Sequence, residues 1–314
     1  MKTAIIGAGA IGRAWAICFA RAGHEVVLWN KSPQRIADAL AYIASVLPTL
    51  SENDLLFGHS PEAILKRISP ESNFTAAVDG ADYLQENAAE AVEIKRQIFS
   101  ELDAASKPSA ILASSTSGIV PSLFTEDLKR RDRCIVVHPL NPPYLVPAVD
   151  VVPAPWTTSK TVAKTLAFLR SCGQTPILMK KEDPGFLTIR IQGAMYHEAW
   201  RLVANGLAAP EDVDIAVREG LALRWSFIGP FETADLNAPG GIRDFVDRYG
   251  ELYRTLYPEG GPVSWSGELM DYVEGERRKQ LPMANHKARQ LWRDKRLMAL
   301  ASHKAAVARK DTSA

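Results

Sequence analysis

The sequence predicts an α/β fold, in which a parallel, doubly wound sheet forms an N-terminal domain over residues 1–182 and an all-α domain follows over residues 183–314. Two observations support this. Up to about residue 182, short apolar segments of strand length alternate with longer segments of helical periodicity. Beyond residue 183 the helical pattern continues without a clear strand. Strands that alternate with helices are joined by crossover connections, which make a sheet parallel.

The first strand–helix–strand unit lies at the very start of the chain. Thr3–Ile6 and His24–Trp29 are apolar segments long enough for buried strands. Ala14–Ala22, between them, is compatible with a helix. The three elements fit within about 30 residues, which is the size of a compact βαβ unit.

A glycine-rich turn joins the first strand to this helix. It contains Gly7, Gly9 and Gly12 as G-x-G-x-x-G, with Ala10 and Ile11 in the last two variable positions. The first glycine permits a tight turn, the second lets backbone approach a pyrophosphate, and the third lets the helix pack on the strand. The helix N-terminus offers unpaired N–H groups to phosphates. We therefore predict a dinucleotide-binding Rossmann domain with these five residues at the cofactor.

The end of the second strand bears on which dinucleotide binds. NAD-binding units commonly carry an acidic residue here, which bonds the ribose 2′-hydroxyl. This chain has Asn30, Lys31 and Ser32 instead. A carboxylate would repel a 2′-phosphate, which carries about −1.5 to −2 charges at neutral pH. NADP(H) is therefore favoured over NAD(H); the alternative is that Asn30 bonds a plain ribose and Lys31 is a solvated turn residue.

The remaining elements follow in alternation. Further strands are expected at residues 74–75, 82–85, 110–114, 134–137, 149–152 and 175–178. Helices are expected at residues 33–47, where Pro48 acts as a stop, and at 91–104, 121–128, 159–172 and 186–217. Asn205-Gly206 predicts a break in the last of these, with a restart at Pro210. Residues 48–73 are irregular and polar, as in an insertion.

Composition excludes several classes of protein. The 314 residues include 37 basic and 36 acidic side chains, so nothing suggests a nucleic-acid partner or an anionic membrane surface. The three cysteines, Cys18, Cys134 and Cys172, are scattered and indicate neither a disulfide framework nor a metal site. No apolar run approaches the ~20 residues of a membrane helix. We expect a cytoplasmic protein that binds a small-molecule substrate.

Several motifs in order resemble the 3-hydroxyacyl-CoA dehydrogenase superfamily. They are the glycine-rich unit, Ser-Thr-Ser-Gly118, His-Pro-Leu-Asn-Pro-Pro-Tyr144, Asp-Pro-Gly-Phe186 and Glu-Ala-Trp-Arg-Leu-Val203. Two later segments, at 227–233 and 292–294, resemble its L-gulonate 3-dehydrogenase (lambda-crystallin) branch. The resemblance covers nearly the whole chain. It implies a Rossmann domain, a helical C-terminal domain and a homodimer formed largely through the helical domains.

The resemblance also implies a catalytic site. His138, at the end of an apolar strand, matches the family's acid/base, a task that suits an imidazole titrating near neutral pH. Asp150 stands where the family has the Glu that orients this histidine, and its side chain is one carbon shorter. Ser117 matches the serine that hydrogen-bonds the reacting oxygen; the alternative is a helix cap. Glu90 and Lys95 match positions that contact the nicotinamide-side ribose; the alternative is a helix-surface pair.

Four further residues are candidates for substrate binding. Asn141 lies three residues past His138 and is expected to shape the same loop. Ile189 occupies a position where the family usually has Asn, so the substrate loses one polar partner. Arg224 and Trp225 either meet a substrate carboxylate or form an interdomain ion pair and core packing.

The predicted function is an NAD(P)-dependent oxidoreductase that transfers hydride between a nicotinamide cofactor and the hydroxyl or carbonyl of a small, gulonate-like 3-hydroxy acid. Two alternatives remain open. One is a 3-hydroxyacyl-CoA dehydrogenase, with Lys66 and Arg67 at the CoA phosphates. The other is a non-enzymatic, crystallin-like or sensor protein that binds a dinucleotide, which the replacements Asp150 and Ile189 favour.

Overall fold

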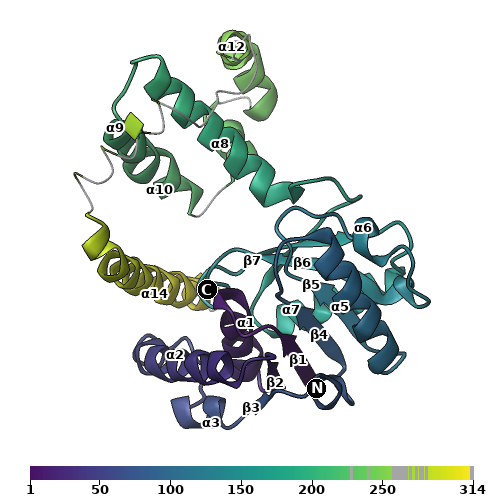
Figure 1. The fold of residues 1–314 in the computed structure, drawn as a ribbon. Helices are drawn as coiled ribbons and strands as arrows, with labels where there is room; N and C mark the ends of the chain where they lie inside the picture. The colour runs from purple at the N-terminus through teal and green to yellow at the C-terminus, as the bar shows by residue number, and fades with distance from the viewer. Residues whose placement is uncertain are drawn as a thin grey trace. The chain divides into compact units, whose positions relative to one another are not determined.

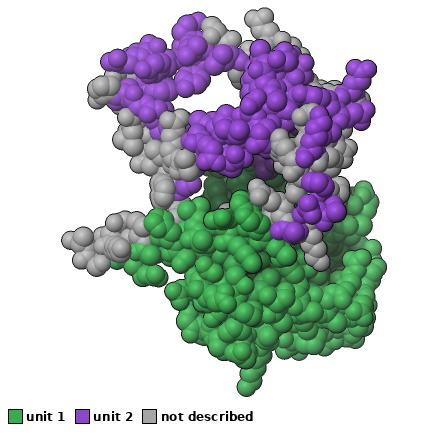
Figure 2. All heavy atoms as spheres, turned by 90° about the vertical axis from the view of Figure 1, so that its left-hand side faces the viewer, with its two compact units in different colours: residues 1–190, 290–314 green, residues 191–289 purple. Residues whose placement is uncertain are grey.

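The computed structural model describes residues 1–226, 229–238, 241–256 and 282–311, with isolated positions between 268 and 279. The chain divides into two compact units, Met1–Arg190 with Gln290–Ala314, and Ile191–Arg289 (Figure 2). The predicted boundary at residue 183 lies near the first point of division and stays a prediction. No helix in the described part is long and apolar enough to cross a membrane.

An eight-stranded sheet forms the centre of the first unit, in the order β3-β2-β1-β4-β5-β6-β7-β8. The strands are β1 (Lys2–Ile6), β2 (Glu25–Trp29), β3 (Ile68–Glu71), β4 (Tyr83–Glu86), β5 (Ile111–Ser114), β6 (Cys134–Pro139), β7 (Ala148–Pro153) and β8 (Thr175–Leu178). From β1, the chain first adds β2 and β3 on one side of the sheet and then β4 to β8 on the other. This is the doubly wound arrangement that the sequence predicts. The predicted α/β fold class is confirmed.

The sheet departs from the predicted parallel arrangement at one pair of strands. β6 and β7 run antiparallel, whereas the other neighbouring strands are parallel. The reason is the length of the connection, which comprises residues 140–147. A parallel return needs about a dozen residues or more, usually with a helix, whereas a short loop turns the chain back on itself.

Helices cover both faces of the sheet (Figure 1). They are α1 (Ala10–Arg21), α2 (Pro33–Glu52), α3 (Pro61–Leu65), α4 (Phe74–Val78), α5 (Val92–Ala105), α6 (Ser122–Thr125) and α7 (Ser159–Ser171). Ile5 of β1 packs with α1, α2 and α7, while its neighbours Ala4 and Ile6 pack with α5 on the other face. Burial on both faces explains why consecutive residues from Ala4 to Ile6 are apolar.

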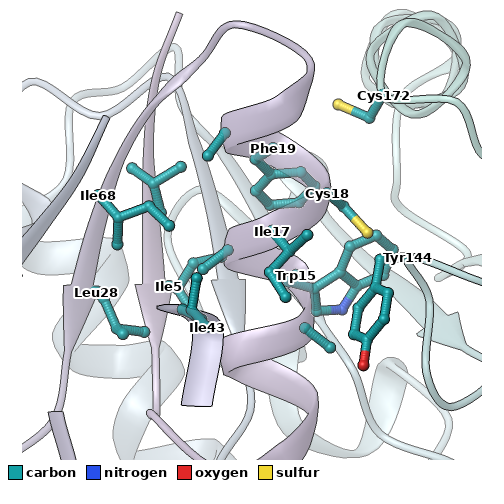
Figure 3. Packing of buried hydrophobic residues seen from close by; sticks show 14 of the residues in the cluster. Ile5, Trp15, Ile17, Cys18, Phe19, Leu28, Ile43, Ile68, Tyr144 and Cys172 are labelled. Atoms are coloured by element: carbon teal, nitrogen blue, oxygen red, sulfur yellow. The ribbon is translucent and has the colours of Figure 1, made fainter. Parts of the chain in front are cut away.

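The core on the α1 face is built around two aromatic side chains of that helix (Figure 3). Trp15 and Phe19 are fully buried, and their rings stack with centroids 5.2 Å apart. Cys18 and Cys172 are buried in the same cluster as free thiols. Desolvation raises the pKa of Cys18 to about 11 and that of Cys172 to about 12. Both cysteines are therefore small core residues of this cluster.

Three local predictions are wrong. Residues 74–75 begin the helix α4 rather than a strand, because Asn73 caps that helix by accepting a hydrogen bond from the Ala76 N–H at 3.0 Å. The expected polar insertion contains β3, which pairs with β2. Helix α2 continues through Pro48 to Glu52, since Leu47 and Leu50 are buried on either side of the proline. Their packing outweighs the one hydrogen bond that proline removes.

The described part of the second unit is helical, as predicted. Its elements and those that flank it are α8 (Phe186–Ala204), α9 (Pro210–Ile215), a π-helical turn (Ala216–Leu221), α10 (Ala222–Trp225), α11 (Pro230–Leu236), α12 (Gly241–Thr255) and α14 (His286–Asp311). α8 ends at the predicted Asn205-Gly206, where Gly206 has φ +66°. Met298 of α14 is buried in the core of the first unit. The motif residues Phe227 and Ile228 lie outside the described residues.

Candidate active site

The three glycines of the first turn have different environments. Gly7 has φ +112°, and a Cβ there would lie 2.8 Å from the backbone oxygen of Asn87. A Cβ on Gly12 would lie 1.8 Å from the backbone oxygen of Gly7. A Cβ on Gly9 would meet nothing within 4 Å. The fold itself therefore requires glycine at positions 7 and 12, whereas Gly9 borders open space.

Gly9 is also the N-cap of α1, and no side chain caps this helix. Ala10 and Ile11 form its first turn. Backbone N–H groups at a helix start have no partner within the helix, and the helix dipole favours negative charge there. The open space beside Gly9 and the uncapped helix together fit the pyrophosphate of a dinucleotide.

The segment after β2 caps the helix α2 and carries a positive charge without an ion pair among the described residues. Asn30 Oδ1 accepts a hydrogen bond from the Ser32 N–H at 3.0 Å. Ser32 is the N-cap of α2, and its Oγ accepts from the Arg35 N–H at 3.5 Å. Lys31 is exposed and makes no ion pair with the described residues. Its ammonium group is therefore available to an anion at the end of β2.

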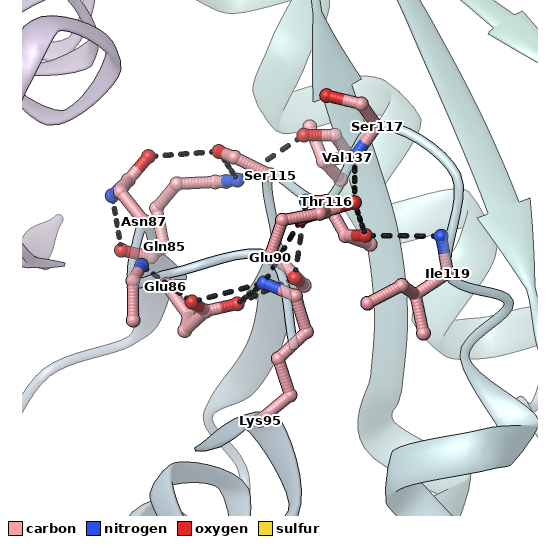
Figure 4. A network of polar contacts seen from close by, with 12 residues as sticks. Gln85, Glu86, Asn87, Glu90, Lys95, Ser115, Thr116, Ser117, Ile119 and Val137 are labelled. Carbon is pink, nitrogen blue, oxygen red and sulfur yellow. Dashed lines mark hydrogen bonds and ion pairs between the residues drawn. The ribbon is translucent and has the colours of Figure 1, made fainter. Parts of the chain in front are cut away.

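A buried ion pair lies at the carboxyl end of β4 (Figure 4). Lys95 Nζ lies 3.0 Å from Glu86 Oε2, and the two side chains are 1 % and 0 % exposed. Glu86 also accepts hydrogen bonds from the Ser114 hydroxyl and the Ala88 N–H, both at 2.5 Å. A buried carboxylate needs such partners, because an unpaired charge in the interior is very costly. The Lys95 side chain is thus almost fully buried, and its ammonium group contacts protein carboxylates.

Glu90 connects this pair to the loop that contains Ser117. Its Oε1 accepts hydrogen bonds from the Thr116 hydroxyl at 2.5 Å, the Ser117 N–H at 2.8 Å and the Gly118 N–H at 3.2 Å. Its Oε2 lies 3.6 Å from Lys95 Nζ. The Ser117 hydroxyl lies outside this network and is exposed (Figure 4). Glu90 therefore fixes the backbone of the loop and leaves the Ser117 side chain available.

The charge of Glu90 is favoured by these contacts. Burial acts to raise the pKa of Glu90, but the hydrogen bond from Thr116, the charge of Lys95 and the two backbone donors outweigh it. The pKa of Glu90 consequently lies below its ordinary value of 4.5. The carboxylate stays ionised at neutral pH and continues to accept all three loop hydrogen bonds.

His138 and Asp150 form a buried pair across β6 and β7. Nδ1 of His138 lies 3.3 Å from Oδ2 of Asp150, and the two residues are 5 % and 0 % exposed. Oδ2 also accepts hydrogen bonds from the Thr188 N–H at 3.2 Å and from the Thr188 hydroxyl. No described residue bonds Nε2 of His138 or Oδ1 of Asp150. One imidazole nitrogen is thus held by the protein, and the other is available to a ligand.

The sheet brings the cofactor and catalytic candidates to one edge. β1, β4, β5 and β6 are parallel neighbours, so the segments that follow them lie side by side at their carboxyl ends. These segments contain Gly7, Asn87, Ser117 and Asn141. Ligands bind open α/β sheets at this edge. Asn141 is exposed, and its side chain bonds none of the described residues.

The remaining substrate-binding candidates lie on helices. Ile189 is half-buried in the first turn of α8, directly after Thr188. Trp225, in α10, has an indole N–H that is buried without a partner among the residues described. The side chain of Arg224 lies outside the described part. No cluster of His, Cys, Asp and Glu among the described residues can hold a metal ion.

Two domain models of one enzyme family match the chain between residues 2 and 264. The NAD binding domain of 3-hydroxyacyl-CoA dehydrogenase matches residues 2–182, and the C-terminal domain of the same enzyme matches residues 185–264. The chain belongs to the 3-hydroxyacyl-CoA dehydrogenase family. It is therefore related to NAD-binding oxidoreductases, as the motifs in the sequence predict.

Curated members of this family show which branches the chain resembles. The lambda-crystallin homolog of Bos taurus is 41 % identical over 305 residues, covering 96 % of this chain and 95 % of the relative. The L-carnitine dehydrogenase of Streptomyces coelicolor is 34 % identical over 273 residues, covering 87 % and 85 %. The predicted likeness to the lambda-crystallin branch is confirmed.

Solved structures of dehydrogenases superpose on this chain, in agreement with the family assignment. FHMPC 5-dehydrogenase, described as an NAD+ dependent dismutase, superposes with a TM-score of 0.82 at 26 % identity, covering 95 % of this chain and 96 % of that one. The 3-hydroxybutyryl-CoA dehydrogenase of Escherichia coli superposes with a TM-score of 0.69 at 27 % identity, covering 89 % of this chain and 58 % of that one.

Sequence patterns do not identify three residues that contact the candidate site residues. Glu86 is fully buried, and its one signal is an acidic residue at the end of an apolar strand. Thr116 donates to Glu90 from a position that looks like an ordinary turn residue. Thr188 bonds Asp150 from 38 residues away along the chain, and no local pattern marks such a contact.

Proposed function

We propose that the protein is an NAD(P)-dependent dehydrogenase that oxidises the hydroxyl of small 3-hydroxy acids or reduces the corresponding ketones. The observation that supports this most is the state of His138. Its Nδ1 faces a buried carboxylate, while its Nε2 has no partner among the described residues. A histidine held in this way is suited to exchange a proton with a substrate hydroxyl.

The geometry supports a proposed role for each residue. Nε2 of His138 accepts the hydroxyl proton during oxidation and returns it during reduction. Asp150 holds the imidazole by Nδ1 and stabilises its positive charge after proton transfer. The Ser117 hydroxyl donates a hydrogen bond to the reacting oxygen, and Glu90 holds the loop that presents it. A bound nicotinamide dinucleotide supplies the group that accepts or gives hydride.

NADP(H) is the proposed cofactor in preference to NAD(H). Lys31 presents an unpaired ammonium group beside Asn30, where a carboxylate would repel a 2′-phosphate. One unit-charge pair is worth about 4 kcal/mol at ~4 Å and an effective dielectric constant near 20. Asn30 can also bond the plain ribose of NAD(H), so the preference depends chiefly on Lys31 and Ser32.

A small acid fits better than a CoA thioester. Lys66 and Arg67, the candidates for CoA phosphates, line a cavity of about 620 Å³ together with Lys2 and Glu25. The latter two residues begin β1 and β2, at the opposite end of the strands from His138. Arg67 also donates to the Ala20 carbonyl at 3.1 Å. Neither basic residue is therefore placed beside the carboxyl edge of the sheet.

The proposed homodimer uses the helical unit. Four apolar side chains along α12 are exposed: Val246, Tyr249, Leu252 and Tyr253. An apolar helix face of this kind is common where two copies of a chain associate. Sedimentation analysis tests this, and a monomer at micromolar concentration contradicts it.

A turnover screen tests the proposed function. Purified protein is assayed with 3-hydroxy acids and 3-hydroxyacyl-CoA esters, each with NAD+ and NADP+, by absorbance of the reduced nicotinamide. We expect turnover with a hydroxy acid and at least a hundredfold loss in His138→Gln, which is the usual contribution of a general base. Dinucleotide binding without turnover on any compound would contradict the proposal and favour the non-enzymatic alternative.

A further inference from the structure

The Asp150 carboxylate is held from two sides, and Thr188 supplies most of the contacts. Oδ2 of Asp150 accepts hydrogen bonds from the Thr188 N–H and the Thr188 hydroxyl, in addition to its contact with His138 Nδ1. We propose that Thr188 is a positioning residue of the active site, which acts by fixing the Asp150 carboxylate against His138. This inference rests on the proposed function, because it assigns a step of that reaction to the pair.

The backbone alone does not set the direction of this carboxylate. Strand pairing places Asp150 opposite His138, but the terminal torsion of an aspartate has a broad, roughly two-fold preference. Oδ1 is buried and bonds none of the described residues, so it does not hold the group in place. The two donors of Thr188 both reach Oδ2 and therefore select the oxygen that faces the imidazole.

The position of Thr188 is itself fixed by the start of α8. Phe186, the first residue of the helix, has φ +50° and is fully buried in the core on the α5 face. The N–H of Thr188 is one of the donors that the first turn of a helix leaves unpaired. Asp150 accepts it and so caps the helix. The beginning of α8 is thus anchored on one side by Phe186 and on the other by Asp150.

The consequence for catalysis concerns the tautomer of His138. A neutral imidazole that donates from Nδ1 to Asp150 has its lone pair on Nε2, which is the atom needed to accept the substrate proton. A carboxylate that rotates away lets the ring change its tautomer and orientation. Loss of the Thr188 hydroxyl should therefore lower kcat and leave the binding of cofactor and substrate unchanged.

The test is a set of variants with a thermodynamic cycle. Thr188→Val keeps the shape and the N–H donor and removes the hydroxyl; we expect kcat to fall about tenfold with both KM values unchanged. Thr188→Ser returns a hydroxyl and should recover most of this loss. In an Asp150→Asn background, Thr188→Val should have no further effect on kcat, because the two residues act through one contact.

A matched control separates positioning from packing. Thr165 is fully buried, outside the site, and its hydroxyl donates to the Thr161 carbonyl at 2.9 Å within α7. Thr165→Val should change the melting temperature and leave kcat unchanged. A Thr188→Val effect on kcat that persists at full size in Asp150→Asn overturns the proposal, as does a normal kcat in Thr188→Val.

A second measurement does not depend on turnover. In protein labelled with 15N-histidine, the Nδ1–H signal of His138 is identified by its loss in His138→Gln. We expect this signal in the wild type and in Thr188→Ser, and broadening by solvent exchange in Thr188→Val. If the signal broadens in Thr188→Val and is retained in Thr188→Ser but no substrate turns over, the proposed function fails and the positioning role stands. If neither the signal nor kcat responds to Thr188→Val in an active enzyme, the positioning role fails alone.

Discussion

His138 and Asp150 are directly opposed residues of the antiparallel β6–β7 pair, with Nδ1 and Oδ2 3.3 Å apart. Directly opposed residues in such a pair have Cβ atoms about 4.5–5.5 Å apart. At this separation a side chain as short as aspartate reaches the imidazole. The strand register therefore explains how an aspartate at position 150, rather than the longer glutamate that the sequence resemblance implies, can hold the imidazole.

Asp150→Asn should lower kcat at least tenfold, with the KM for the cofactor unchanged. Asparagine keeps the shape of the buried side chain but removes the charge that stabilises a protonated imidazole. Steady-state kinetics check this, with Asp127→Asn as the control, because Asp127 is exposed and outside the site. Turnover at the wild-type rate would show that the carboxylate has no part in the reaction.

Asn30→Asp should reverse the cofactor preference. An aspartate retains the oxygen that accepts from the Ser32 N–H, so the local fold is preserved while a negative charge is added. The added charge repels a 2′-phosphate, and we expect NADPH affinity to fall at least tenfold while NADH affinity changes little. Fluorescence titration of both cofactors measures this. Tighter binding of NADH than of NADPH by the wild type contradicts the premise.

Glu90→Gln should make stability less dependent on pH in the acid range. The pKa of Glu90 lies below 4.5 in the folded protein, so around and below this pH the unfolded chain binds more protons than the folded one. The stabilisation by the carboxylate is fully present above about pH 4.5 and is lost as the pH falls through the lowered pKa. Glutamine carries no charge and removes this component.

Denaturant unfolding at several pH values between 3 and 7 measures the effect. The free energy of unfolding should fall less steeply toward low pH in Glu90→Gln than in the wild type, and should be lower near neutral pH. Glu93→Gln is the control, since Glu93 is exposed on the adjacent α5. Parallel curves for Glu90→Gln and the wild type would rule out this role.

The sequence predicts most of the sheet because buried strands and their connecting helices have local signatures. It misses β3 and the continuation of α2 past Pro48, since both depend on partners elsewhere in the fold: β2 for the strand, and the buried core for Leu47 and Leu50. Local patterns predict that a helix or strand is present, whereas tertiary packing decides where it begins and ends.

The same distinction applies to the site. His138 lies near the carboxyl end of β6 and Ser117 follows β5, so their proximity to a ligand at this edge can be inferred from the order of the elements. The contacts that hold them cannot be inferred in this way. Glu90 bonds the loop of Ser117 from 27 residues away, and Thr188 of α8 bonds Asp150 of β7. Antiparallel pairing of β6 and β7 also places Asp150, and it depends on the short connection between them.

Gly9→Ala should weaken cofactor binding without destabilising the fold, whereas Gly12→Ala should destabilise the fold. Gly9 has φ −75° and open space around a Cβ, so alanine fits the folded chain and slightly restricts the unfolded one. Its methyl group would occupy the space where a pyrophosphate approaches. A Cβ on Gly12 would overlap the Gly7 carbonyl at 1.8 Å, which the fold cannot accommodate.

We expect Gly9→Ala to melt at or slightly above the wild-type temperature with at least tenfold weaker dinucleotide binding, and Gly12→Ala to be strongly destabilised. Thermal unfolding and cofactor titration on both variants test this, and full cofactor affinity in Gly9→Ala would place the dinucleotide elsewhere.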